Sequence, residues 1–401
     1  MKLLFQLSLR NLLRYKRRNA MLLAAIAVAV AGVNATNTLL RGYQYDMLES
    51  VVANLTGHVK VHLPGYRDDP NIQKGFLLEG GFIPDVSAEM LQGWAARVRV
   101  PGVIMSERET RGVQLVGIDP QAESISFIGN ASIDGEFLLD GNDKRIVIGK
   151  ELARQLETRV GRRLVILAQG EDGKNRERGY RIAGLYDAEG TGLEKSYVFV
   201  GINRLQSLLD SDAVTEVSVR LTDEVYREAA KESITKAFAD LEVMDWRELE
   251  PQTAEMFRFA DVTIYIWFLL MMGALTFGLV NSLIAAVMER VKELGMLRAL
   301  GMQRRTVILQ VVLESSIMMA LGVLLGTCVG VLIYFSIQDG IDLSPWADGA
   351  ELVGISSLLV PVLLPSDVIQ VAWMSMVLGL LASLYPAWRV VSIRPLDALR
   401  T

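Results

Sequence analysis

The sequence has very few of the residues that form disulfides and zinc sites. It contains a single cysteine, Cys328, and two histidines, His58 and His62, among 401 residues. One cysteine excludes a disulfide within the chain, and the small number of Cys and His residues argues against a zinc site and a Ser-His-Asp triad. The two histidines would share one face of a strand, but no further ligand accompanies them. We therefore expect no metal site.

Motifs for nucleotide binding and hydrolysis are also absent. No G-x-x-x-x-G-K-[ST] segment is present to hold ATP phosphates, and no G-x-S-x-G segment could form a nucleophile elbow. No basic patch interleaved with aromatic residues indicates nucleic-acid binding. The sequence therefore predicts a protein that is not an enzyme, binds no cofactor and does not bind nucleic acid.

Long apolar segments are the dominant feature of the sequence. Charged residues make up 22% of the chain, as in soluble proteins, although 51% of the residues are hydrophobic, so the apolar residues must be concentrated in segments. Residues 19–40 are uncharged and would span roughly 33 Å as a helix, enough to cross a bilayer. Three further spans are predicted at 262–288, within 306–338, and at about 368–388. Glu314 is the only charged residue that interrupts the third span before its end.

The first 18 residues are basic and carry no acid. Phe5, Leu9, Leu12 and Leu13 fall on one helical face, which predicts an amphipathic helix on the inner membrane surface over 1–18. A cleavable signal peptide is the alternative for this region, since Ala27-Val28-Ala29 could be a cleavage site. The long basic region and the apolar residues beyond that site favour a retained anchor.

Basic residues are distributed unevenly among the connecting segments. Residues 1–18, 289–305 and 389–401 are rich in Lys and Arg, whereas 339–367 contains acidic residues and no Lys or Arg. The positive-inside rule then places both termini in the cytoplasm and puts the polar region 41–261 and the loop 339–367 outside.

The polar region 41–261 has the pattern of an α+β domain. Val59, Val61 and Leu63 alternate with polar residues, as in a strand, and Gly170–Gly173 would connect a hairpin. Helices are predicted at 87–99, after an Asp85 or Ser87 cap, and at 223–239. The other predicted strands are 113–118, 145–148, 164–168, 181–186, 197–200, 217–221 and 241–244. We expect β-α-β units at the ends and a β-rich insertion at about 125–200.

Residues 289–305 are too charged to lie in lipid, yet they contain several apolar residues. Val291, Leu294 and Leu297 recur every third residue and would share one helical face. This pattern predicts a short cytoplasmic helix whose apolar face needs a partner. The alternative is a basic loop that only sets the orientation of the chain.

Two motifs resemble the MacB/FtsX-like family of ABC-transporter permeases. Glu293-Leu294-Gly295 and Arg298-Ala299-Leu300-Gly301 are similar to the loop after the second membrane helix of that family. Tyr385-Pro386-Ala387-Trp388-Arg389, with Arg394-Pro395-Leu396-Asp397-Ala398-Leu399-Arg400, resembles the family's C-terminal ending. Trp388 departs from that pattern, which usually has a small or basic residue.

The resemblance implies how such a protein works. In the family this loop is a coupling helix that docks on a separate ABC ATPase, which binds ATP and Mg and forms a dimer. The coupling residues carried over are Glu293, Leu294, Gly295, Leu297, Arg298, Ala299, Leu300 and Gly301. It also implies a bacterial inner-membrane permease that pairs with a second copy or a homologous permease and transmits motion to a porter-like periplasmic domain. A periplasmic carrier or adaptor and membrane lipid would be further partners.

Two blocks are most similar to lipoprotein-releasing (LolC/LolE-type) permeases. They are Gly57-His58-Val59-Lys60-Val61-His62 and Val147-Ile148-Gly149-Lys150-Glu151-Leu152-Ala153. This similarity implies release of lipoprotein or another lipid-linked cargo from the membrane. Efflux of peptides or drugs and activation of a cell-wall enzyme fit the same architecture. An ATP-independent sensor or scaffold is a further alternative.

The third span contains small residues at regular spacing. Gly322, Gly326 and Gly330 are four residues apart and would allow close helix packing, either within the chain or across a dimer axis. Glu314 precedes them and would be costly in lipid without a partner. It is expected either to link the span to the coupling helix through Arg304 or Arg305, or to lie at the level of the lipid headgroups.

Overall fold

The computed structural model divides the chain into two compact units. A helical unit comprises Met1–Met47 and Met256–Thr401, and an α/β unit comprises Leu48–Glu255. The structure describes residues 10, 16–78, 86–188, 193–288, 296, 302–342 and 358–392.

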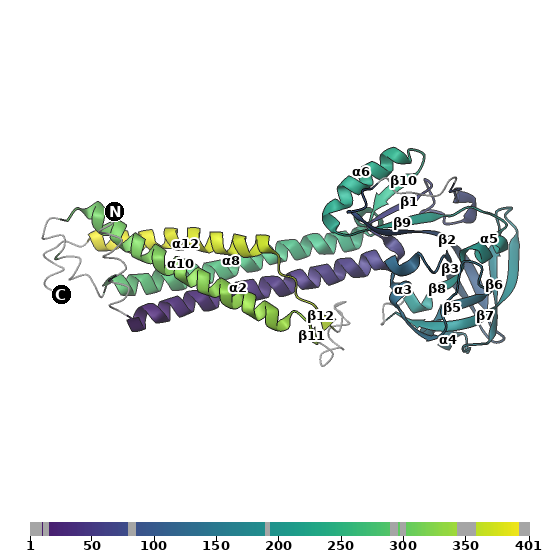
Figure 1. Ribbon diagram of the computed structural model, residues 1–401, viewed down its shortest axis with the longest axis horizontal. Helices are drawn as coiled ribbons and strands as arrows, with labels where there is room; N and C mark the ends of the chain where they lie inside the picture. The colour runs from purple at the N-terminus through teal and green to yellow at the C-terminus, as the bar shows by residue number, and fades with distance from the viewer. Residues whose placement is uncertain are drawn as a thin grey trace. The chain divides into compact units, whose positions relative to one another are not determined.

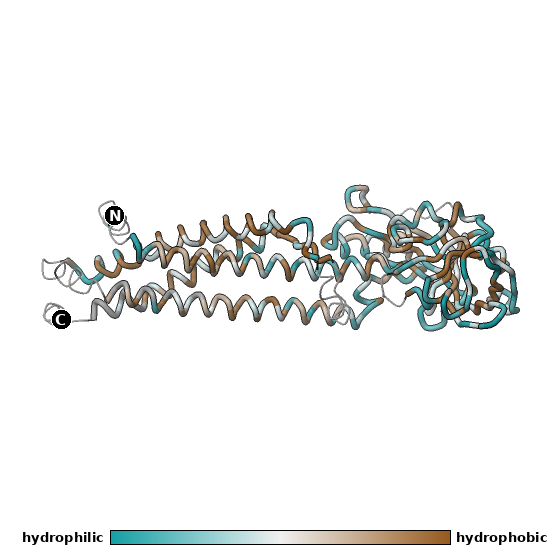
Figure 2. Tube along the Cα trace, turned by 90° about the horizontal axis from the view of Figure 1, so that it is seen from below, coloured by the Kyte–Doolittle hydropathy of each residue, from teal (hydrophilic) through white to brown (hydrophobic). Residues whose placement is uncertain are grey.

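Long helices form the helical unit and lie lengthwise beside one another (Figure 1). They are α2 (Lys16–Val51), α8 (Pro251–Met288), α10 (Arg304–Ile337) and α12 (Pro365–Ser392). Within the described residues, four helices are long and apolar enough to cross a membrane, as predicted. Apolar residues, brown in Figure 2, recur along the long helices. A small pair of strands, β11 (Ile341–Asp342) and β12 (Leu358–Leu359), precedes α12.

The four helices share an apolar core. Ile26 and Val30 of α2 pack in one cluster with Met272 of α8, Met319 of α10 and Val371 of α12, which are 3% exposed or less. Their other apolar faces remain exposed, most of all on α8. Exposed apolar faces are expected where lipid or another membrane helix covers them.

The described part of the α/β unit contains a ten-stranded mixed sheet. Its strand order is β10-β1-β9-β2-β3-β8-β5-β7-β4, and β6 pairs with β2 and β7. The strands are β1 (Val59–His62), β2 (Leu91–Met105), β3 (Thr110–Ile118), β4 (Ser132–Gly135), β5 (Arg145–Gly149), β6 (Arg163–Gln169), β7 (Asn175–Asp187), β8 (Tyr197–Gly201), β9 (Glu216–Leu221) and β10 (Glu242–Asp245).

Short helices and turns connect these strands. The helices are α3 (Phe127–Asn130), α4 (Lys150–Gln155), α5 (Ile202–Leu209), α6 (Arg227–Ala237) and α7 (Trp246–Leu249). Single turns of other helix types are η1 (Val52–Thr56), η2 (Ile72–Lys74), η3 (Glu123–Ile125), η4 (Leu193–Lys195) and η5 (Glu224–Tyr226). In Figure 1, α6 covers the part of the sheet that contains β10 and β1.

Strand β2 connects the two parts of this sheet. Its first half, from Leu91 to Arg97, pairs with β9, and its second half, from Val98 to Met105, pairs with β3. Residues of β1, β9 and α6 form one apolar cluster, whereas β3, β5, β6, β7 and β8 contribute to two others. The β-rich part of the unit therefore begins within β2, ahead of the predicted insertion at 125–200.

The predicted strands are confirmed, including the hairpin in which β6 and β7 pair around Gly170–Gly173. The helix predicted at 223–239 is present as η5 and α6. The helix predicted at 87–99 is wrong, because strand β2 begins at Leu91. Cross-strand pairing with β9 and β3 outweighs the local helical pattern there, as tertiary packing commonly does.

Candidate functional site

Most of the predicted coupling segment lies outside the described residues. Helix α8 ends at Met288 and α10 begins at Arg304. Of the residues between 289 and 301, the structure describes Met296 alone. Glu293, Leu294, Gly295, Leu297, Arg298, Ala299, Leu300 and Gly301 remain sequence-based predictions.

The three glycines of α10 face α2 of the same chain. A Cβ at Gly322 would lie 2.6 Å from a methyl carbon of Ile26, and one at Gly326 would lie 2.7 Å from the backbone oxygen of Ala27. A Cβ at Gly330 would meet the Cβ of Asn34 at 3.0 Å. Helix α2 therefore occupies the space that a side chain at these positions would need.

Glu314 lies on α10 and is half-buried, while Arg304 and Arg305 at the start of that helix are exposed. The next residue, Ser315, is buried, and its hydroxyl donates to the backbone oxygen of Val311 at 2.9 Å. The link from Glu314 to the coupling segment remains a prediction.

A polar cluster joins three of the long helices. The Arg41 Nε on α2 donates to Asp367 Oδ2 on α12 at 2.8 Å, and Arg41 Nη1 donates to Gln44 Oε1 at 3.1 Å. Gln44 Nε2 in turn donates to Asp261 Oδ1 on α8 at 2.9 Å. Arg41 Nη1 also lies 3.9 Å from that aspartate oxygen. We call these four residues the Arg41 cluster.

The segment before α12 also packs on α2. The Val362 N–H donates to the backbone oxygen of Thr38 at 3.1 Å, and a Cβ at Gly42 would collide with the backbone of Val360. Neither this contact nor the Arg41 cluster was predicted from the sequence. The signal available was the first charged residue after an uncharged run, Arg41, together with an acidic residue just before the last span, Asp367.

Charged side chains are buried inside the α/β unit. Lys60 Nζ of β1 lies 3.2 Å from Glu216 Oε2 of β9, and Arg99 Nε of β2 lies 3.8 Å from the same oxygen. Burial opposes ionisation of both members of the first pair. It lowers the pKa of Lys60 to about 8, although Glu216 acts in the opposite direction. The nearby cations Arg99, Lys60 and Arg97 outweigh burial at Glu216 and lower its pKa to about 2.

The two histidines are buried in the α/β unit. His58 Nδ1 accepts a hydrogen bond from the Leu221 backbone N–H at 3.1 Å, and burial together with Arg220 lowers the pKa of His58 to about 4. His62 Nδ1 lies 3.6 Å from Glu242 Oε2. In the part of the chain that the structure describes, no group of three or more His, Cys, Asp or Glu residues is placed to hold a metal ion.

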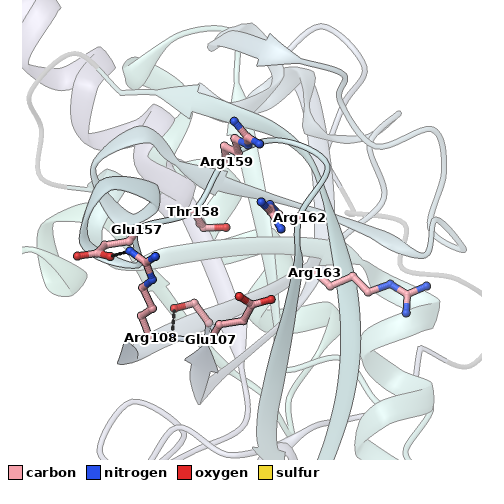
Figure 3. A pocket seen from close by; sticks show the side chains of 8 residues that line it. Glu107, Arg108, Glu157, Thr158, Arg159, Arg162 and Arg163 are labelled. Carbon is pink, nitrogen blue, oxygen red and sulfur yellow. Dashed lines mark hydrogen bonds and ion pairs between the residues drawn. The ribbon is translucent and has the colours of Figure 1, made fainter.

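A pocket of about 360 Å³ opens on the surface of the α/β unit (Figure 3). It lies between the turn that joins β2 to β3 and the segment that joins α4 to β6. In Figure 3 the Arg108 guanidinium turns toward Glu157, whereas Arg163 extends away from the other side chains. The lining residues are Ser106, Glu107, Arg108, Glu157, Thr158, Arg159, Arg162 and Arg163, and every one of them is polar or charged.

Models of known protein families match both units of the chain. A MacB-like periplasmic core domain model matches residues 20–237, and an FtsX-like permease C-terminal model matches residues 265–395. The lipoprotein-releasing system transmembrane protein LolC of Xylella fastidiosa is 22% identical, covering 97% of this chain and 96% of the relative. LolE of Haemophilus influenzae is 22% identical over 93% of this chain and 91% of the relative.

A shorter match is the macrolide export ATP-binding/permease protein MacB of Bdellovibrio bacteriovorus. It is 30% identical over 31% of this chain and 16% of that protein. The similarity to the LolC and LolE relatives, in contrast, extends over both units of the fold. With a family model covering more than half of its length, the chain belongs to the MacB/FtsX-like family of ABC-transporter permeases.

Proposed function

We propose that this chain is the membrane subunit of a lipoprotein-releasing ABC transporter in the bacterial inner membrane. The observation that supports this most is the similarity to LolC and LolE relatives over nearly the whole length of the chain. The MacB relative, which would suggest efflux, matches less than a third of the chain. In this proposal, ATP and Mg are bound by a separate ATPase dimer, and this chain itself binds no cofactor.

The α/β unit would work outside the cytoplasm, where it receives motion through the membrane helices. Binding of ATP would make the ATPase bind one state of the permease more tightly than the other. This difference in affinity would drive the switch between the two states. A second permease copy or a homologous permease would complete the complex, because an ATPase dimer offers two docking sites. A periplasmic carrier would accept the released lipoprotein.

The coupling role is tested at the apolar residues of segment 289–301. Leu294→Asp and Leu297→Asp are each expected to abolish co-purification with the ATPase while the chain still inserts into the membrane. Leu139→Asp is a suitable control, since Leu139 is an exposed leucine of the α/β unit. Normal ATPase association in the two coupling variants would contradict the docking role.

The cargo is tested by depleting the chain in cells and locating lipoproteins. Accumulation of outer-membrane lipoproteins in the inner membrane is expected, and normal localisation would contradict lipoprotein release.

The orientation of the chain in the membrane is tested with single cysteines in a Cys328→Ser background. A cysteine at Asp348 should react with an impermeant reagent from outside, and one at Gln303 only from inside. The reverse pattern would overturn the proposed topology.

A further inference from the structure

The arginine pocket of the α/β unit has more positive charge than its carboxylates neutralise. It contains four arginines and two glutamates, Glu107 and Glu157. Arg108 is neutralised by one of them, since its Nη1 lies 2.5 Å from Glu157 Oε2. Among the described residues, the side chains of Arg159, Arg162 and Arg163 have no carboxylate within ion-pair distance.

The strand pairing beside the pocket adds positive charge to this edge of the sheet. Arg163 at the start of β6 lies directly opposite Arg181 of β7. Like charges at directly opposite positions of an antiparallel pair destabilise a sheet. Neither arginine has an ion-pair partner within the described residues, and both are exposed. A bound anion at this edge would offset the repulsion.

The pocket backbone is held independently of the arginine side chains. The Arg162 N–H donates to the Arg159 backbone oxygen at 3.2 Å, and the Gly161 N–H donates to the Ile182 backbone oxygen at 2.9 Å. Gly161 has φ +84°, a conformation that favours glycine. The turn that carries Arg159 and Arg162 is therefore anchored to β7 by its main chain, and replacing either side chain leaves these bonds in place.

We propose that this pocket binds a phosphate group carried on a polar molecule. A guanidinium presents a planar pair of N–H donors that matches phosphate oxygens, and a phosphate can accept from several such groups at once. The Thr158 hydroxyl adds a further donor at the same site. The volume of about 360 Å³ leaves room for more than the phosphate itself. Because every lining residue is polar, the rest of the ligand is a sugar or glycerol rather than an acyl chain.

The test uses the full-length chain purified in detergent, with binding measured by calorimetry. Inorganic phosphate, glycerol 3-phosphate and a short-chain phosphatidylglycerol are the probes, and citrate is the anion without phosphate. Saturable binding of glycerol 3-phosphate, tighter than that of citrate, is expected. If the phosphatidylglycerol binds more tightly than glycerol 3-phosphate, the source is a lipid headgroup; if it binds no more tightly, the source is a soluble phosphate ester. Absence of binding by all three phosphate probes, or equal binding of citrate, would overturn the proposal.

Matched variants assign the binding to this pocket. The double variant Arg159→Ala/Arg162→Ala should weaken glycerol 3-phosphate binding about tenfold or more, since two charge-assisted contacts are lost. Arg162→Lys keeps the charge but loses the paired donors and should give a smaller loss. Arg154→Ala removes another exposed arginine, which pairs with Glu151 on α4 outside the pocket, and should leave affinity unchanged. Equal affinity in the wild type and the double variant would contradict the assignment.

Discussion

Arg97 and Glu123 form a two-point ion pair in the interior of the α/β unit. Arg97 Nε donates to Glu123 Oε1 at 2.7 Å and Arg97 Nη2 donates to Glu123 Oε2 at 2.8 Å, with both side chains 1% exposed or less. Arg97 Nη1 also donates to the backbone oxygen of Leu55 at 2.9 Å. Leu55 has φ 60°, which is unusual for a bulky residue. The pair therefore stabilises a strained turn directly after α2.

Removing one member of this pair should be strongly destabilising. Glu123→Ala leaves the Arg97 guanidinium buried without its counter-charge, which costs about 3–5 kcal/mol. A large drop in the denaturant midpoint of the full-length chain in detergent is the expected result. Glu232→Ala is the control, because Glu232 pairs with Lys236 on the exposed surface of α6, where such a pair contributes little to stability. Similar midpoints for the two variants would show that the buried pair does not stabilise the fold.

The stability of the α/β unit should fall in acid because of Glu216. Burial opposes its ionisation, but Arg99, Lys60 and Arg97 lower its pKa from 4.5 to about 2. In that interval the unfolded chain binds more protons than the folded one, so the stabilisation is complete above 4.5 and is lost as the pH falls toward 2. Unfolding midpoints measured across this range test the effect.

The variant Glu216→Gln separates this residue from the other carboxylates. It should be less stable than the wild type near neutral pH, because Lys60 loses its partner, and its stability should decline less steeply in acid. The double variant Lys60→Met/Glu216→Gln removes both buried charges and should recover part of the loss. An acid profile in Glu216→Gln as steep as that of the wild type would assign the pH dependence to other residues.

The sequence was sufficient to predict the membrane helices because each is a long, nearly uncharged run. The spacing of Gly322, Gly326 and Gly330 could likewise be assigned to one helical face without a structure. The partner of that face could not, because nothing in α10 specifies α2. The helix prediction for residues 87–99 was wrong for a related reason. Its helical spacing is local, whereas the β9 partner of β2 lies more than 100 residues later.

The polar contacts were even less predictable. Arg41 and Asp367 are separated by 326 positions, and Lys60 and Glu216 by 156. The alternation around β1 suggested one apolar and one polar strand face. In the structure all four residues of β1 are buried. Its valines pack in a cluster with α6 and β9, while Lys60 lies against Glu216 and His62 against Glu242. Burial of Lys60 and His62 involves residues far along the chain and has no signal in the local sequence.

The Arg41–Asp367 contact should stabilise the packing of α2 against α12. Asp367→Ala removes a charge-assisted hydrogen bond to a partly buried arginine and should cost about 1–2 kcal/mol. Asp261→Asn is the control, since its carboxylate lies 3.9 Å from Arg41 and is 60% exposed, so its effect should be small. Thermal unfolding of the full-length chain in detergent measures both. The double variant Arg41→Asp/Asp367→Arg exchanges the two charges. It should recover part of the stability lost in Arg41→Asp or Asp367→Arg alone, and no recovery would contradict a direct pair.

Substitution of single glycines should show which helix faces are closely packed. Gly326→Ala would place a Cβ 2.7 Å from the backbone oxygen of Ala27, which cannot move without shifting α2, so a cost of about 1–3 kcal/mol is expected. Gly273→Ala on α8 is the matched control, because a Cβ there meets nothing within 4 Å. Alanine is the better helix former by about 1 kcal/mol, so this variant should be neutral or more stable. Unfolding midpoints in detergent distinguish the two, and equal effects would contradict the close contact between α10 and α2. If Gly273→Ala is neutral in the isolated chain but weakens pairing with a second permease, then α8 contributes to that interface.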